Sequence, residues 1–316
     1  MVRNFLFFIF IFINSIFLLF YKKNEVHSSA ELVIKPGSKL NQISEILYDN
    51  NLIKNKLVFI FWVKINFSEK KLKFGEYFFS GNFSVNSILE KLLEGKSVNK
   101  KITIIEGSSK NELLYSLNKI DLNKKLSLKS IPNQIIADTY FYESFDSPEN
   151  VLNNLVLKSN KSALEIWENR DKSIPLKNIS EMFILASIVE KETAIKNEKP
   201  LISGVFYNRL KKNMRLQSDP TVVYAITLGE RKMERKLLRK DLKFKSKFNT
   251  YTNNGLPPSP ISIPGLDSLK SVANPYQSDF LYFVSNQKDG HHIFSVSYEE
   301  HLENIKLVKE SKTNNE

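Results

Sequence analysis

The fold and function of this chain are best indicated by the stretch Ile184-Leu-Ala-Ser-Ile-Val-Glu-Lys-Glu-Thr193. Eight apolar or small residues, Met182 to Val189, run into Glu190 without a proline or glycine. The pattern predicts a buried helix with a carboxylate at the end of its apolar run. A carboxyl group held against apolar surface is hard to ionise, so its pKa rises and it can deliver a proton near neutral pH. Glu190 is therefore the predicted catalytic acid, of the kind that acts on a glycosidic bond.

Helical spacing separates the two glutamates of this stretch. The neighbours of Glu190 at three and four residues are all small, which leaves room for a ring beside the carboxylate: Ala186, Ser187, Thr193 and Ala194. Glu192 lies four residues before Lys196 and is predicted to form a surface ion pair with it. We therefore assign the chemistry to Glu190 and a supporting role to Glu192. The alternative is that both glutamates are ordinary solvated helix ends.

Composition excludes several classes of site. The chain of 316 residues has room for roughly two domains. It has no cysteine, which excludes disulfides, thiolate metal sites and cysteine nucleophiles. The four histidines lack metal-ligand spacing, and no phosphate-binding glycine motif is present, so we expect neither a metal nor another cofactor. The net charge of +12 favours an anionic partner (lipid headgroups, a wall polymer or nucleic acid), although a lysine-rich soluble surface gives the same total.

The amino terminus is predicted to be a membrane anchor. Phe5 to Tyr21 gives 17 nearly unbroken apolar residues, at the short end of the ~17–25 needed for a spanning helix. No small-residue cleavage site lies close behind it, which favours a retained anchor over residues 1–21. A polar linker over residues 22–30 is expected to follow. We expect the amino terminus to lie inside and the bulk of the chain outside. Charge alone does not establish this orientation, because Arg3 favours it and Lys22-Lys23 favour the opposite one.

A short unit occurs twice with an offset of 70 residues. Val33-Ile-Lys-Pro-Gly-Ser38 and Thr103-Ile-Ile-Glu-Gly-Ser108 each read as a strand, a glycine turn and a serine cap, before an amphipathic helix. We therefore expect an α+β fold: a small module over 31–98, a second α+β unit over 99–146 and a mixed α/β catalytic domain over 147–316. The first module resembles LysM, a fold that binds N-acetylated glycans, although it could equally serve as a spacer.

The C-terminal half is predicted to be mostly helical. Expected elements are helices over Pro148–Ser159 and Ser162–Arg170, the Glu190 helix capped by Ser180, a helix over Leu201–Leu210, an irregular loop over Thr250–Pro264, strands over Leu281–Val284 and His292–Val296, and a final helix over Tyr298–Val308.

Several blocks in this half resemble one family. They are Ala186–Thr193, Val205-Phe-Tyr-Asn-Arg-Leu210, Met214-Arg-Leu-Gln-Ser-Asp-Pro-Thr-Val-Val-Tyr224, Asn249-Thr-Tyr251, Gly255-Leu-Pro-Pro258 and Tyr282-Phe-Val284. In this order they are similar to the signature of the endolytic murein transglycosylases, the YceG-like (MltG) family. Lys247, Ser259 and Ile263 depart from the family's usual residues, which puts the shape of their loop in doubt.

The resemblance implies a single-pass enzyme of the bacterial inner membrane whose catalytic domain faces the cell wall. Such an enzyme cuts the MurNAc-β-1,4-GlcNAc bond within nascent peptidoglycan strands and leaves a 1,6-anhydroMurNAc end, near penicillin-binding synthases. One carboxyl group suffices, because the C6 hydroxyl of the substrate is the nucleophile, whereas hydrolytic glycosidases need two. The alternative is a catalytically silent glycan-binding scaffold. A nucleic-acid partner is not expected, because no reading motif is present.

Five further residues that match the family blocks are candidates to bind substrate: Gln217, Asp219, Asn249, Tyr251 and His292. Each has a structural alternative. Asp219 could instead cap the helix that follows it. Asn249 and Tyr251 could pin their own loop, and His292 could be bonded to backbone or could orient Glu190.

Overall fold

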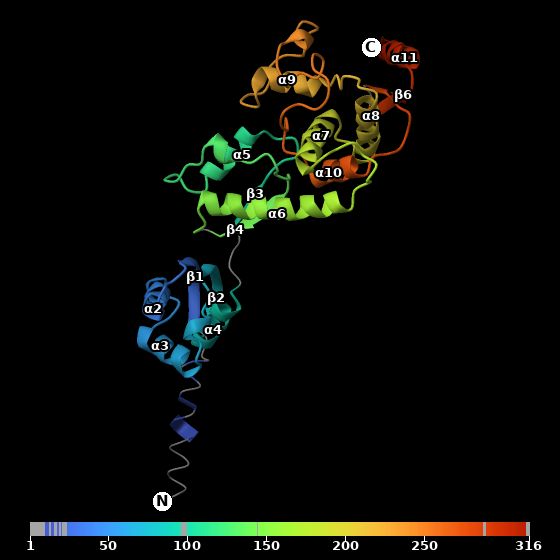
Figure 1. The fold of residues 1–316 in the computed structure, drawn as a ribbon. Coiled ribbons are helices and arrows are strands. Elements are labelled where there is room, and N and C mark those ends of the chain that lie inside the picture. Colours follow the sequence, from blue (N-terminus) through green and yellow to red (C-terminus); the bar gives the residue numbers. More distant parts are fainter. Residues whose placement is uncertain are drawn as a thin grey trace, which may run out of the picture. The chain divides into compact units, whose positions relative to one another are not determined.

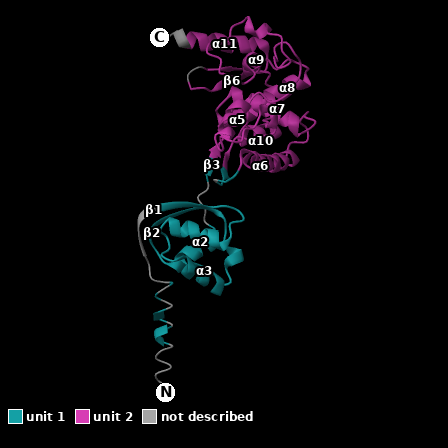
Figure 2. Ribbon diagram, turned by 90° about the vertical axis from the view of Figure 1, so that its left-hand side faces the viewer, with its two compact units in different colours: residues 1–101, 141–146 teal, residues 102–140, 147–316 magenta. Residues whose placement is uncertain are grey.

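The computed structural model describes residues 10–12, 14–15, 18, 20, 24–95, 100–143, 145–286 and 289–313 (Figure 1). The chain divides into two compact units, residues 1–101 with 141–146 and residues 102–140 with 147–316 (Figure 2). Most of the predicted anchor over Phe5–Tyr21 lies outside the described residues. Among the helices that are described, none is both long and apolar enough to cross a membrane.

The first unit is a two-stranded sheet covered by helices. Strand β1 (Asn24–Ile34) pairs antiparallel with β2 (Gly75–Phe83), and the helices are α2 (Leu40–Asp49), α3 (Lys56–Ile65) and α4 (Val85–Glu94). One apolar core joins sheet and helices, with Leu47, Phe59, Tyr77, Phe79 and Ile88 fully buried. The linker predicted over 22–30 is therefore too long, because the chain pairs with β2 from Asn24 onward.

The remaining α-helices and strands belong to the second unit, except that β3 and β4 each have two residues in the first. They are β3 (Lys100–Thr103), α5 (Lys110–Asn118), β4 (Thr139–Tyr142), α6 (Pro148–Glu168), α7 (Ile179–Glu192), α8 (Lys199–Lys211), α9 (Asp219–Thr227), α10 (Leu266–Ala273), β5 (Tyr282–Ser285), β6 (His292–Ser295) and α11 (Tyr298–Thr313). The chain passes between the units through β3 and β4, which pair with each other. β5 and β6 form an antiparallel hairpin, as predicted.

Helix α7 lies at the centre of the second unit. It packs against α6, α8, α9 and α10, and every residue from Met182 to Val189 is buried (Figure 1). The large side chains around it include Phe206 and Leu269, both fully buried. The helix ends at Glu192, because Thr193 adopts an extended conformation. The predicted buried helix with glutamates at its end is confirmed.

Four expectations for this half differ from the structure. The N-cap of α7 is Asn178, whose side chain accepts from the Glu181 backbone N–H at 3.0 Å, and not Ser180. Two predicted helices over 148–170 form one helix, α6, because no proline or glycine interrupts the chain after Pro148. Ser109, one residue after the predicted serine, caps α5. Residues 102–140 join the C-terminal unit, so 99–146 is not a separate domain.

Candidate active site

Glu190 lies in a closed ion pair at the end of α7. Its Oε1 is 2.8 Å from Lys199 Nζ, and its Oε2 accepts from the Gly265 N–H at 2.8 Å and the Ser268 hydroxyl at 2.6 Å. The side chains of Glu190 and Lys199 are only 5% and 3% exposed. Three donors therefore occupy both oxygens. The sequence predicted apolar surface and room for a ring beside Glu190, whereas the structure places the Lys199 ammonium against its Oε1.

The backbone around Glu190 is fixed by loop-to-loop hydrogen bonds. The Gly107 N–H donates to Ile263 O at 2.9 Å, and the Ile263 N–H donates to Ser108 O at 2.8 Å. The Ala137 N–H donates to Pro264 O at 2.8 Å. These bonds hold Gly265, the N-cap of α10, under the carboxylate. Because the amino-terminal end of a helix carries partial positive charge, it favours the anion there. Glu190 thus ties α7 to the starts of α8 and α10.

Glu192 occupies a different environment two residues later. It is half-buried and accepts a hydrogen bond from the Ser218 hydroxyl. Loss of water around the carboxyl group raises its pKa from 4.5 to about 7, and the nearby negative charge of Asp219 acts in the same direction. The Ser218 bond and the charge of Arg209 oppose this shift. Burial therefore favours the protonated form of Glu192, the property that the sequence assigned to Glu190.

A network of buried hydroxyl groups fixes the partner of Glu192. The Ser218 N–H donates to Thr250 Oγ1 at 3.0 Å, and Thr221 Oγ1 donates to Ser218 O at 2.6 Å. The two threonine hydroxyls lie 2.8 Å apart. Arg209 is buried close by and donates to the backbone oxygens of Leu216 and Leu281, both at 2.7 Å. Arg209 therefore ties structural elements together and adds a positive charge near Glu192.

Asp219 and Tyr251 lie beside Glu192. The Tyr251 hydroxyl donates to Asp219 Oδ1 at 2.6 Å, with Asp219 exposed and Tyr251 half-buried. Burial raises the pKa of Tyr251, and its hydrogen bond to Asp219 contributes to the rise. Gln217 is exposed and has a left-handed backbone, with φ of 49°. The structure thus brings Asp219 and Tyr251 together with the predicted supporting residue, Glu192, and leaves Gln217 open to solvent.

Asn249 is fully buried in its own loop. Its amide nitrogen donates to Leu242 O at 3.0 Å and Phe244 O at 2.8 Å, and its Oδ1 accepts from the Tyr251 N–H at 2.9 Å. These bonds use the side chain to hold the loop. The structure therefore favours the alternative interpretation of Asn249, as the residue that presents Tyr251, over contact with a substrate.

His292 is bonded to Glu198, a residue that the sequence did not single out. His292 Nδ1 lies 2.7 Å from Glu198 Oε2, and the His292 N–H donates to Oε1 at 2.8 Å. His291 Nδ1 lies 3.0 Å from the same oxygen. Burial opposes the charge on Glu198, but the hydrogen bonds from the two histidines outweigh it and hold the pKa of Glu198 below its usual value. Neither alternative for His292, a backbone bond or orientation of Glu190, matches this arrangement.

Two more corrections concern lysines. Lys196 pairs with Asp267 at 2.9 Å and not with Glu192, because α7 ends at Glu192 and the four-residue helical spacing does not continue beyond it. Lys199 was missed altogether. No local signal predicts its role, because its distance from Glu190 depends on the chain turning between α7 and α8.

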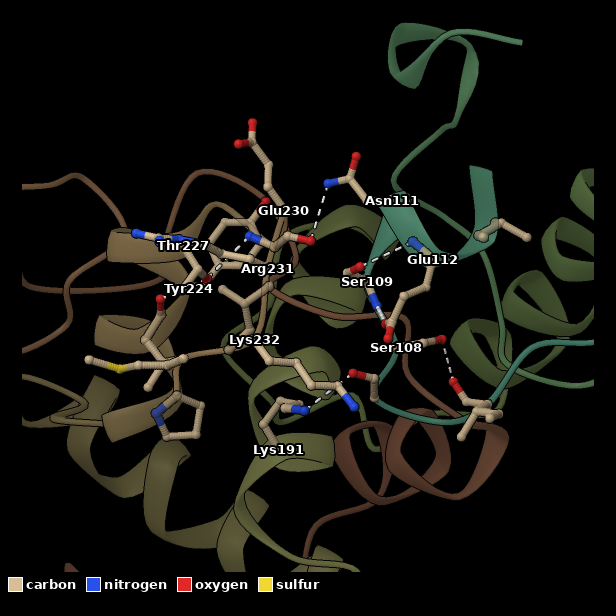
Figure 3. Close-up of a pocket in the computed structure, with 18 of the residues that line it drawn as sticks. Ser108, Ser109, Asn111, Glu112, Lys191, Tyr224, Thr227, Glu230, Arg231 and Lys232 are labelled. Atoms are coloured by element: carbon tan, nitrogen blue, oxygen red, sulfur yellow. Dashed lines mark hydrogen bonds between the residues drawn. The ribbon is translucent and has the colours of Figure 1, made fainter. Parts of the chain in front are cut away.

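A pocket of about 1210 Å³ opens beside this site, between the start of α5 and the segment after α9 (Figure 3). Lys191 and Asp219, the neighbours of Glu192 in sequence and in space, both line it. Its other lining residues include Tyr115, Tyr224, Arg231 and Lys232. The lining of the pocket is therefore basic in part and includes aromatic rings. Among the described residues, no group of histidines and carboxylates is arranged to hold a metal ion.

Comparison with known proteins gives consistent matches. The model of the YceG-like family matches residues 32–307. An endolytic murein transglycosylase of Bacillus subtilis is 28% identical over 87% of this chain and 83% of its own length. One from Streptococcus pneumoniae is also 28% identical, over 89% of this chain, which spans 58% of that relative. A crystal structure of a yceG-like protein from Listeria monocytogenes is 30% identical with a TM-score of 0.56, covering 87% of this chain and 99% of that one.

Proposed function

This chain belongs to the YceG-like family, and we propose that it is an endolytic murein transglycosylase with Glu192 as its catalytic acid. The bond cleaved is the β-1,4 linkage between N-acetylmuramic acid and N-acetylglucosamine inside a glycan strand. The family prediction made from the sequence is confirmed, and the relatives are named for this class of enzyme. The observation that carries the proposal is the position of Glu192 between Ser218 and Asp219, where burial raises its pKa, next to a pocket that Lys191 and Asp219 line and that is large enough for several sugar units.

Glu192 would act twice in one cycle. Protonated, it gives its proton to the glycosidic oxygen as the bond from the muramic acid C1 to that oxygen breaks. The resulting carboxylate then takes the proton of the C6 hydroxyl, whose oxygen forms the new bond to C1. The acid is regenerated and no water is consumed. Because nucleophile and electrophile belong to one sugar, the second step has the advantage of an intramolecular reaction.

Asp219 is suited to stabilise the transition state. Positive charge develops at C1 and the ring oxygen as the linkage breaks, and a fixed anion nearby lowers its energy. The Tyr251 hydroxyl holds Asp219 at 2.6 Å, and Asn249 holds Tyr251 through its backbone. The negative charge of Asp219 also helps to keep the proton on Glu192 until a substrate arrives. Glu190, predicted from the sequence as the acid, instead becomes a positioning residue for the end of α7.

The pocket offers contacts for a glycan that carries peptides. Tyr115 and Tyr224 supply aromatic faces on which sugar rings can stack, and Lys191, Arg231 and Lys232 supply partners for carboxylates. Figure 3 shows Lys191 and Lys232 extending into the same part of the pocket. Gln217 is an exposed amide next to Asp219, available to N-acetyl or hydroxyl groups.

Location and partners follow from the same proposal. Residues 1–21 would anchor the chain in the bacterial inner membrane with the catalytic unit on the outer face, which the apolar run over Phe5–Tyr21 supports. The module over 31–98 would be LysM-like and hold glycan. Penicillin-binding synthases would be neighbours, since they make the strand that is cut.

A single digest tests the activity. The full chain is incubated with defined, uncross-linked glycan strands, and the products are identified by mass spectrometry. The proposal predicts internal cuts with anhydro ends, one water lighter than hydrolytic products. Products with reducing ends would identify a hydrolase. Unchanged strands that still co-sediment with the protein would identify a silent scaffold, and either result would overturn the proposal.

A further inference from the structure

Helix α3 of the first unit exposes an unusually apolar face. Leu57, Phe61 and Ile65 are 74%, 54% and 49% exposed, and Phe67, just beyond the helix, is 87% exposed. We name these four residues the α3 apolar patch. Their spacing of four residues places the three helical members on one side of α3. The helix therefore presents one coherent apolar stripe to solvent.

The stripe is additional to the core-facing side of the same helix. Phe59 and Val63 are fully buried in the core of the first unit, together with Tyr77 and Phe79 of β2. A helix at the surface of a soluble domain normally has a polar outer side, and one that is apolar on both sides is normally buried. Contiguous exposed apolar surface of this kind marks a site of contact with a protein or a membrane.

Phe67 adds a second observation. Its φ is 49°, and the Phe67 and Ser68 N–H groups donate to Lys64 O at 3.0 Å and Val63 O at 3.1 Å. This is a Schellman-type helix end, where glycine is the usual residue because other side chains are strained there. Phe67, which has this left-handed backbone, is also the most exposed residue of the patch. Folding alone does not explain a phenylalanine at this position.

The surroundings of the patch are strongly basic. Between residues 54 and 73 the chain has six lysines and one acidic residue, Glu69: Lys54, Lys56, Lys64, Lys70, Lys71 and Lys73. Lys56 pairs with Glu45 at 2.7 Å, and Lys73 donates to Glu94 O at 3.0 Å. The others are exposed to solvent. An apolar centre with a lysine rim matches the boundary between the acyl chains and the anionic headgroups of a bilayer.

The amino-terminal apolar stretch ends on the same helix. The ring of Phe20 is buried and stacks on Trp62 of α3 at 4.1 Å, and on Phe61 of the patch at 6.3 Å. Phe10, Phe12 and Leu18 of that stretch are described, and all three are exposed. The patch is thus continuous with apolar sequence that has no other cover in the described part of the chain.

From these observations we infer that the α3 apolar patch docks on an anionic lipid bilayer, with Leu57, Phe61, Ile65 and Phe67 among the upper acyl chains and the lysines at the phosphates. This would hold the first unit against the membrane surface, in addition to any anchor. The inference does not depend on the catalytic assignment. A second copy of the chain is the competing occupant of the patch.

The absence of native cysteine allows a direct test on the full chain. Phe67→Cys and Phe78→Cys variants carry one environment-sensitive fluorophore each and are reconstituted in vesicles with or without phosphatidylglycerol. Phe78 is the matched control, because it is an exposed phenylalanine of the same unit on β2, between Tyr77 and Phe79, which face the core. Lipids with a nitroxide near the headgroup quench any label that enters the interface.

The inference predicts roughly twofold stronger quenching at position 67 than at 78, a larger difference in anionic vesicles, and loss of the difference when Phe61→Lys is added. Equal quenching at both positions, or no quenching at 67, would overturn it. Self-quenching of the 67 label that disappears on dilution with unlabelled chain would identify a second copy as the occupant and overturn it as well.

Discussion

Glu190 and Glu192 lie two residues apart at the end of one helix, yet they occupy opposite kinds of site. About 200° of rotation separates them around the axis of α7, so they face different neighbours. Glu190 meets Lys199, the Gly265 N–H and the Ser268 hydroxyl in a closed ion pair. Glu192 meets the Ser218 hydroxyl and the charge of Asp219, a residue that lines the pocket. The comparison teaches that two carboxyl groups at the end of one buried helix can have different functions, because the partners that tertiary folding brings to each of them differ.

The largest expected effect is the loss of activity when Glu192, and not Glu190, is replaced by glutamine. Glu192→Gln removes the proton that the proposed mechanism delivers to the glycosidic oxygen, so kcat should fall about 10³-fold, within the range known for general acids. The fold should be unaffected, because glutamine can still accept from Ser218. Release of anhydromuropeptides by mass spectrometry gives the rate, and circular dichroism checks the fold. Near wild-type release by this variant would remove Glu192 from the mechanism.

The second effect concerns the stability that the ion pair of Glu190 and Lys199 gives to the fold. Glu190→Gln removes the close counter-charge of the buried Lys199 ammonium and leaves only the exposed Glu106 carboxylate, 4.0 Å away, so the free energy of unfolding should fall by about 3–5 kcal/mol. Adding Lys199→Met removes the stranded charge and should restore most of that loss, since buried pairs contribute little over apolar replacements. Denaturant titration measures both variants. If Glu190→Gln instead stays fully stable and loses all activity, the roles of the two glutamates are the reverse of those proposed.

The sequence predicts a structural feature where neighbouring residues determine it, and fails where residues distant in sequence determine it. The apolar run from Met182 to Val189 specifies a buried helix by itself, and the structure has one. The order of family blocks identified the family. The environment of Glu190 could not be predicted, because Lys199 and Gly265 approach only after two chain reversals. The pKa of Glu192 likewise depends on Ser218 and Asp219, which tertiary folding brings to it.

A third test uses pH. The pKa of Glu192 is about 7 in the folded chain and ordinarily 4.5, so the folded state holds a proton that the unfolded state releases between these values. The stability contribution of this proton is complete below about pH 4.5 and is lost as the pH rises through about 7. Activity should fall tenfold per pH unit above about 7, as the acid form disappears. A flat profile into alkaline solution would contradict the assignment.

The smallest effect compares two serines that bind the two carboxylates. Ser218 donates to Glu192 and stabilises its charged form, so Ser218→Ala should raise the pKa of Glu192 further and move the alkaline limb of activity upward by about one pH unit. Ser268 donates to Glu190 at 2.6 Å, and Ser268→Ala is the matched control. It should lower stability by about 1–3 kcal/mol and leave the pH profile where it was. If Ser268→Ala shifts the alkaline limb of the pH–activity profile and Ser218→Ala does not, the titrating acid is the ion-paired Glu190. Because each variant removes one hydroxyl of the same kind, any difference between them reports which carboxyl group carries the proton.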